Sequence, residues 1–210
     1  MKLFFCDISD FPKNVTELQN RLPESRRLRM AQYLRREDQL RCLGAGLLLA
    51  HCFGVAYDDR MSHNSYGKPL MKETGTFFNL SHSGDYVVLA TADQEIGVDV
   101  QQHEEGNFAA MAKISFHPDE QNYLASCKNN QKEVFYSLWT LKESYMKAVG
   151  MGFSLPSASF SISLTEHGPR FDVENGYSLS SIPFHSGYSL AVCTKSSLEN
   201  PLLQKVRWFG

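Results

Sequence analysis

Residues 82–91 read HSGDYVVLAT, and residues 185–194 read HSGYSLAVCT. Both stretches begin with His-Ser-Gly, a composition typical of turns, and both continue as an apolar strand. They start 103 residues apart in a chain of 210 residues, which is close to half the chain length. This recurrence predicts a duplicated unit in which helices come before a small set of strands.

The first half of the chain follows that order. After a first strand in MKLFFCDIS (residues 1–9), apolar and charged residues occur at near-helical spacing from about Pro23 to Phe53, and Gly54 is a typical helix terminator. Three short apolar runs come next and predict an antiparallel meander: residues 77–80, 86–90 and 96–100.

The second half shows the same order. Asn130 and Glu133 have the spacing of a capping box and predict a helix through Lys147, ended by Gly150. Four apolar residues of this segment share one stripe that faces a core: Val134, Leu138, Leu141 and Tyr145. Residues 158–164, 170–182 and 188–194 predict a second meander.

These patterns predict an α+β fold that is a pseudodimer of two similar halves. Each half consists of helices packed on a small antiparallel β-meander. We expect residues 1–100 to form the N-terminal half and residues 101–210 to form the C-terminal half.

Composition and charge exclude several classes of protein. With 42% hydrophobic residues and 14 Phe, the chain can bury a core and is not disordered. A formal net charge of −2 gives no signature of nucleic-acid binding. Seven of the ten Arg lie between Arg21 and Arg41, and this local cationic region could hold a phosphate.

Five scattered Cys without any C-x-x-C spacing indicate neither a disulfide framework nor a zinc site, and they fit a reducing cytoplasm. The most apolar stretch, residues 43–57, is shorter than the roughly 20 residues that a membrane-spanning helix needs. We therefore expect a cytoplasmic protein with no membrane partner.

Asp99 and Glu143 are the candidate metal ligands. Strand alternation sends Asp99 to the side opposite Val98 and Val100, and Glu143 lies four residues before Lys147 on the predicted helix. One interpretation is an exposed i,i+4 ion pair between Glu143 and Lys147, worth about 0.3–0.5 kcal/mol. The other is that the two carboxylates converge on Mg2+, with lysines neutralising substrate phosphates.

Two polar segments are candidates for anion binding. Ser81 and His82 lie in a segment rich in small residues that reads as a tight turn, and Lys68 lies in a Gly-Lys-Pro turn. Such turns are more often only turns. No P-loop, Rossmann or nucleophile-elbow motif is present.

Taken in order, these motifs resemble those of the single-chain, surfactin-synthetase-activating type of 4′-phosphopantetheinyl transferases. The resembling pieces are Gly67-Lys68-Pro69, Phe78-Asn79-Leu80-Ser81-His82-Ser83, Gly97-Val98-Asp99-Val100, Phe116-His117-Pro118-x-Glu120 and Trp139-x-x-Lys142-Glu143-Ser144-x-x-Lys147-x-x-Gly150. The resemblance covers most of the chain.

The resemblance implies a Mg2+-dependent transferase that moves the 4′-phosphopantetheine group of coenzyme A to a serine of an acyl or peptidyl carrier protein and releases 3′,5′-ADP. It also implies a monomer with a cleft between the two halves. Residues 1–100 would bind coenzyme A, and residues 101–210 would carry the metal, the catalytic groups and the docking site for the carrier protein. The resemblance implies three groups of site residues. The metal ligands would be Asp99 and Glu143, and the catalytic residues would be Glu143 and Lys147. The coenzyme-binding residues would be Arg41, Lys68, Ser81, His82, Lys142 and Lys147.

Two positions depart from the pattern of many members. Gln101 stands where they carry an acid, and an amide brings no charge. Arg26, Arg27 and Arg29 stand near the place of lysines that bind the 3′-phosphate in some relatives, and the sequence does not say which of them acts. The alternatives are a Mg2+-dependent phosphohydrolase and a non-catalytic module that binds coenzyme A or nucleotides.

Overall fold

A computed structural model gives the structure of residues 1–72, 75–196 and 202–208. Its helices are α1 (Thr16–Gln19), α2 (Glu24–Ala31), α3 (Arg36–Phe53), α4 (Phe108–Ser115), α5 (Pro118–Ser126) and α6 (Gln131–Val149). Its strands are β1 (Lys2–Asp7), β2 (Met61–His63), β3 (Pro69–Met71), β4 (Phe77–Ser83), β5 (Tyr86–Ala92), β6 (Ile96–Gln102), β7 (Ile162–Thr165), β8 (Gly168–Phe171), β9 (Ser178–Ser181), β10 (Tyr188–Thr194) and β11 (Leu203–Lys205). The class is therefore mixed α+β, as predicted.

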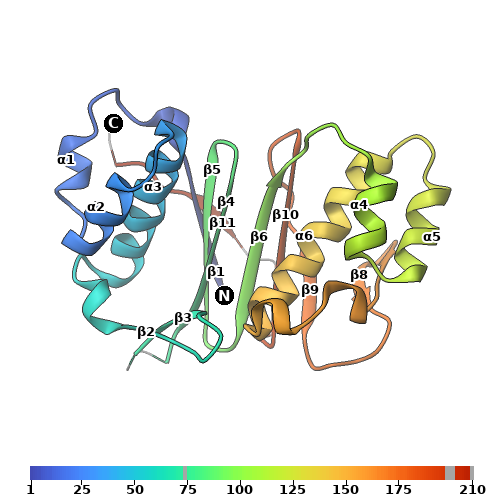
Figure 1. The fold of residues 1–210 in the computed structure, drawn as a ribbon. Coiled ribbons are helices and arrows are strands. Elements are labelled where there is room, and N and C mark those ends of the chain that lie inside the picture. Colours follow the sequence, from blue (N-terminus) through green and yellow to red (C-terminus); the bar gives the residue numbers. More distant parts are fainter. Residues whose placement is uncertain (73–74, 197–201, 209–210) are drawn as a thin grey trace.

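Two sheets lie in the middle of the molecule, with α1–α3 outside one and α4–α6 outside the other (Figure 1). One sheet has the strand order β11-β1-β5-β4, and the other has the order β6-β10-β9. Strands β2 and β3 form a separate hairpin, as do β7 and β8. In the described chain a strand, three helices, a hairpin and two further strands occur in this order from β1 to β5, and again from β6 to β10.

Local signals explain the long helices and the turns. Helix α3 ends at Gly54, whose φ of 82° suits a residue without Cβ, and α6 ends at Gly150 in the left-handed conformation. The two His-Ser-Gly stretches precede β5 and β10, and Gly84 and Gly187 both have positive φ. The predicted stripe of α6 packs into the hydrophobic core of the second half.

The structure corrects the predicted three-stranded meander. Strand β5 pairs with β4 on one side and with β1 on the other, so both of its edges are occupied. Strand β6 instead pairs with β10 in the second sheet. The boundary expected between residues 100 and 101 falls inside this strand.

The structure places a capping box at the start of α5 and not at the predicted start of α6. The Asn130 side chain makes no capping hydrogen bond, although α6 does begin after it. A capping box instead opens α5, where the His117 side chain accepts from Asp119 N and the Glu120 carboxylate accepts from His117 N. Histidine is an unusual capping residue, which is why the sequence pattern did not reveal it.

An apolar layer joins the two sheets. Val88 and Ala90 of the first sheet meet Val98, Val100 and Val192 of the second sheet, and all five are fully buried. No helix within the described residues is both long and apolar enough to cross a membrane. The joint between the sheets places β6 and α6 beside β4, which is where the candidate site lies.

Candidate functional site

Strand β6 presents Asp99 to helix α6. Val98 and Val100 point into the apolar layer, so alternation turns Asp99 to the opposite face, as predicted. Gly97 allows the close approach, because a Cβ there would overlap backbone atoms of Ser144 and Ala148 on α6.

The Asp99 carboxylate is held on one oxygen only. Its Oδ1 accepts hydrogen bonds from Lys147 Nζ at 2.6 Å and from Ser81 Oγ at 2.8 Å. The residue is 5% exposed, and within the described chain its buried Oδ2 has no hydrogen-bond partner. A buried oxygen of an acidic group without a donor is costly, so this atom is a candidate to bind a ligand.

Glu143 and Lys147 lie one helical turn apart on the face of α6 that is turned toward Asp99. Burial and the nearby Asp99 charge raise the pKa of Glu143, and the Lys147 ammonium opposes that shift. Lys147 Nζ also donates to Ser81 Oγ at 3.1 Å. Asp99, Ser81 and Lys147 therefore form one connected cluster, with Glu143 beside it.

The donor set fits a hard divalent cation. Asp99 Oδ2 and the Glu143 carboxylate are oxygen ligands of the kind that Mg2+ prefers. The described residues contain no group of three or more acidic, imidazole or thiolate side chains able to hold a metal ion. A cation bound by two carboxylates would complete its coordination with water and substrate oxygens, as Mg2+ usually does.

Two cavities meet at the hairpin formed by β2 and β3. The first, of about 280 Å³, is lined by Lys68 and Asn79 from the first half and by Glu143 and Lys147 from the second. The second, of about 310 Å³, is lined by two arginines, two histidines and one acid: Arg26, Arg29, His63, His82 and Asp38. Gly67 and Pro69 line both cavities, so the two cavities adjoin at this hairpin, and residues of both halves line the first of them. We call the two adjoining cavities the cleft.

The structure resolves which arginines of α2 face this cleft. Arg26 and Arg29 line the cavity, and Arg26 Nε also donates to the Tyr57 hydroxyl at 3.3 Å. Arg27 is an exposed residue of the same helix.

His82 lines the same cavity. Desolvation by the cavity walls, with the positive charges of Arg41 and Lys147, lowers the pKa of His82. Arg41 itself is engaged with protein groups: it donates to the Gly84 carbonyl at 2.7 Å and pairs with Asp38 at 2.6 Å. It therefore lies near the predicted anion site and holds the turn that follows β4.

Lys68 lines the first cavity, but its ammonium is bonded to the backbone. It donates to the carbonyls of Ala148 at 2.7 Å and of Ile96 at 3.1 Å. Burial lowers the pKa of Lys68 to about 8. These contacts tie the hairpin of the first half to the end of α6.

The predicted anion-binding turn at Ser81 and His82 is a strand. Both residues belong to β4, which pairs with β5 along residues 77–83. Because side chains alternate along a strand, Ser81 points toward β6 while His82 lines the cavity on the other side. His82 therefore faces a cavity, whereas the Ser81 hydroxyl is bonded within the protein.

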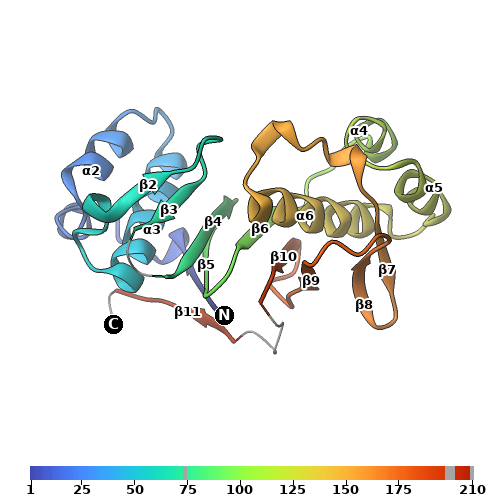
Figure 2. The same ribbon diagram turned by 90° about the horizontal axis from the view of Figure 1, so that it is seen from below.

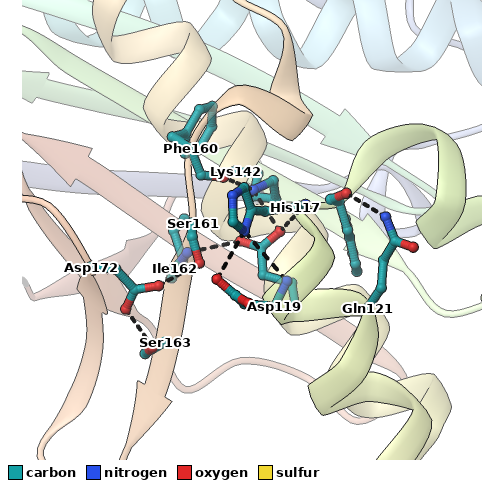
Figure 3. A network of polar contacts seen from close by, with 11 residues as sticks. His117, Asp119, Gln121, Lys142, Phe160, Ser161, Ile162, Ser163 and Asp172 are labelled. Carbon is teal, nitrogen blue, oxygen red and sulfur yellow. Dashed lines mark hydrogen bonds and ion pairs between the residues drawn. The ribbon is translucent and has the colours of Figure 1, made fainter.

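Lys142 is not part of the cluster, which corrects the coenzyme contact expected for it. Its side chain is 2% exposed, pairs with Glu120 at 2.7 Å and donates to the Phe160 carbonyl at 2.7 Å (Figure 3). Desolvation lowers the pKa of Lys142, and Glu120 counteracts this. The residue follows Leu138 by one turn and so lies within the buried stripe of α6, a periodic signal that could have revealed this.

Comparison with protein families gives two adjoining matches. The model described as 4′-phosphopantetheinyl transferase superfamily matches residues 95–193. The model described as 4′-phosphopantetheinyl transferase, N-terminal, matches residues 10–94.

Similar proteins include 4′-phosphopantetheinyl transferase Sfp of Bacillus subtilis, 31% identical in an alignment 181 residues long that covers 81% of this chain and 80% of that protein. The 4′-phosphopantetheinyl transferase gsp of Aneurinibacillus migulanus is 40% identical over 98 residues, 46% of this chain and 40% of that protein. Among solved structures, the holo-[acyl-carrier-protein] synthase of Thermotoga maritima overlays on 48% of this chain and 61% of its own, with a TM-score of 0.41 and 19% identity.

Proposed function

The chain belongs to the 4′-phosphopantetheinyl transferase family, and from this membership we propose how its residues carry out the reaction. The enzyme transfers the phosphopantetheine group of coenzyme A to a carrier protein. In our proposal the acceptor atom is a serine hydroxyl oxygen and the second product is 3′,5′-ADP.

Asp99 and Glu143 would hold a Mg2+ ion. Buried Asp99 Oδ2 and the nearby Glu143 carboxylate are the oxygens that support this assignment. When bound, the ion would neutralise charge on the coenzyme diphosphate.

Glu143 is the proposed general base. In the transfer, the serine oxygen forms a bond to the β-phosphorus while the bond from that phosphorus to the ADP oxygen breaks. The serine proton passes to the Glu143 carboxylate oxygen that does not ligate the cation. Lys147, one turn further along α6, would stabilise negative charge that develops on the diphosphate.

The cleft is the proposed coenzyme site. Its basic cavity offers Arg26, Arg29 and His82 to the phosphate-bearing adenosine end. Its other cavity leads to Glu143 and Lys147, where the diphosphate would lie. Lys68 would contribute here by shaping the hairpin wall, since its ammonium is bonded to backbone carbonyls.

The observation that carries this proposal is the buried Asp99 Oδ2, for which the described residues provide no donor, beside Glu143 and Lys147, which line the first cavity. The test is incubation with coenzyme A, Mg2+ and an unmodified carrier protein, followed by mass spectrometry of the carrier. A gain of one phosphopantetheine on serine, dependent on Mg2+, is the expected result. Hydrolysis of coenzyme A without an acceptor would indicate a phosphohydrolase, and binding without turnover would indicate a coenzyme-binding module.

The repeated order of elements supports a pseudodimer of two α+β halves. Helices α3 and α6 would be equivalent, and the site would exist once, because β1 presents the apolar Phe4 and Cys6 toward α3 where β6 presents Asp99 toward α6. Since one chain supplies both walls of the first cavity, we expect an active monomer. The free cysteines fit our expectation of a cytoplasmic location. Sedimentation of the active enzyme as an obligate oligomer would contradict this.

A further inference from the structure

The junction between the two halves contains a row of hydrogen bonds that is not a β-ladder. Strands β4 and β6 lie next to each other at this junction (Figures 1 and 2). They belong to different sheets, and each is paired with another strand on one edge. The backbone N–H groups on the free edge of β6 need acceptors from elsewhere.

Alternate side chains of β4 supply those acceptors. Val98 N donates to Asn79 Oδ1 at 2.9 Å, and Val100 N donates to Ser81 Oγ at 3.2 Å. Gln102 N donates to Ser83 Oγ at 3.0 Å. Every second residue of one strand thus pairs with every second residue of the other, which fixes the register of β6 on β4.

The central rung also holds the catalytic cluster. Ser81 Oγ accepts from Val100 N and from Lys147 Nζ, and it donates its proton to Asp99 Oδ1. A hydroxyl has one proton and two lone pairs, so all its hydrogen-bonding capacity is used within the protein. Ser81 is 6% exposed, and it cannot donate to a coenzyme phosphate without releasing Asp99.

We propose that Ser81 is a positioning residue, which links the register of the two halves to the orientation of Asp99 and Lys147. The inference rests on the proposed function of that site. By fixing Oδ1 toward itself and Lys147, Ser81 leaves Oδ2 of Asp99 available to a cation. Ser83 forms an equivalent rung without contacting Asp99 or Lys147, and so provides a matched control.

The experiment compares Ser81→Ala, Ser81→Thr and Ser83→Ala in the full chain. We expect Ser81→Ala to lower kcat by about 10-fold or more and to raise the Mg2+ concentration for half-maximal activity. KM for coenzyme A should stay within about twofold. Ser81→Thr keeps the hydroxyl and should recover most of kcat, and Ser83→Ala should keep the wild-type kcat.

Two readouts do not depend on turnover. Amide hydrogen exchange should become faster at Val100 in Ser81→Ala and at Gln102 in Ser83→Ala. Binding of Mn2+ in the presence of coenzyme A, followed by electron paramagnetic resonance, should weaken only in Ser81→Ala.

The opposing outcomes are distinct. An increased KM for coenzyme A with unchanged kcat and unchanged Mn2+ binding would make Ser81 a phosphate contact and overturn the proposal. Equal kcat values for Ser81→Ala and Ser83→Ala would show that Ser81 has only the structural role of Ser83, and would also overturn the proposal. A wild-type protein that transfers nothing to any carrier would refute the proposed function. The exchange and Mn2+ measurements would still test the positioning role of Ser81, because they do not depend on turnover.

Discussion

Helix α6 carries two lysines that each form an ion pair with a carboxylate of another element, Lys142 with Glu120 of α5 and Lys147 with Asp99 of β6. The surroundings of the two pairs differ. The Lys142–Glu120 pair has side-chain exposures of 2% and 1%, whereas those of the Lys147–Asp99 pair are 29% and 7%. Both oxygens of Glu120 receive hydrogen bonds, since Ile162 N and His117 N add to Lys142. Asp99 has one oxygen without a partner in the described chain.

The difference supports our proposal that the Lys142–Glu120 pair is structural and the Lys147–Asp99 pair is functional. A buried pair with every oxygen satisfied fixes α5, α6 and β7 relative to one another (Figure 3) and has no capacity left for a ligand. In the Lys147–Asp99 pair, Lys147 lines a cavity and Asp99 Oδ2 has no partner in the described chain, so this oxygen can bind a ligand. The predictions below test whether loss of each pair affects stability or activity.

The largest effect is expected from Asp99→Ala and Glu143→Ala. Each removes an oxygen ligand from the proposed cation, and transfer to the carrier should fall by at least about 10³-fold. Carrier mass spectrometry measures this, and thermal unfolding should show a folded protein. Turnover at the wild-type rate in ordinary Mg2+ would reject the site.

Lys142→Met should act on stability. It leaves the Glu120 carboxylate buried without its cation, which typically costs about 3–5 kcal/mol. Denaturant unfolding measures this loss. The double variant Lys142→Met/Glu120→Leu removes both charges and should recover a large part of it. A fully stable single variant with defective transfer would reverse the assignment of the two pairs.

Lys147→Ala should slow the chemical step by about 10²-fold while changing coenzyme A affinity less. Lys147→Arg should rescue little, because a planar guanidinium does not replace a compact ammonium between Asp99 and Ser81. Single-turnover rates and coenzyme A binding distinguish the two effects. Weakened binding with an unchanged chemical step would make Lys147 a ground-state phosphate anchor.

Glu143→Gln should stabilise the free protein at neutral pH by about 0.5–2 kcal/mol while abolishing transfer. The pKa of Glu143 is raised on folding, so the folded state retains its proton over a range where the unfolded state has lost it. The stability advantage of Glu143→Gln should therefore grow as pH rises from the usual glutamate value through the raised pKa, and then level off. Melting temperatures between pH 4 and pH 8 test the trend, and a gain confined to acidic pH would contradict it.

The smallest effect is expected from Gln101→Glu. Gln101 lies two residues after Asp99 on β6 and so shares its side of the strand. A third carboxylate should be tolerated and should change the preference among Mg2+ and Mn2+. Steady-state rates with each cation measure this, and complete inactivation would show that the amide has a structural role.

Asn79, Ser83 and Glu120 are the structurally important residues that sequence reasoning did not assign. Asn79 and Ser83 repeat at the strand period with Ser81, a signal hidden by reading this segment as a turn. Glu120 forms a capping box with an unusual His117, and its partner Lys142 is 22 residues away. In each case the deciding contact joins segments that are not adjacent in sequence.

The sequence alone determined the features that depend on neighbouring residues. Helical periodicity placed Glu143 and Lys147 on one face of α6, and strand alternation turned Asp99 away from the buried Val98 and Val100. The tertiary structure alone decided that β6 pairs with β10, that Lys142 forms an ion pair with Glu120, and that the Ser81 hydroxyl donates a hydrogen bond to Asp99. The reason is physical: backbone geometry fixes which way a side chain points within its own element, whereas its partner depends on which distant element packs against that face.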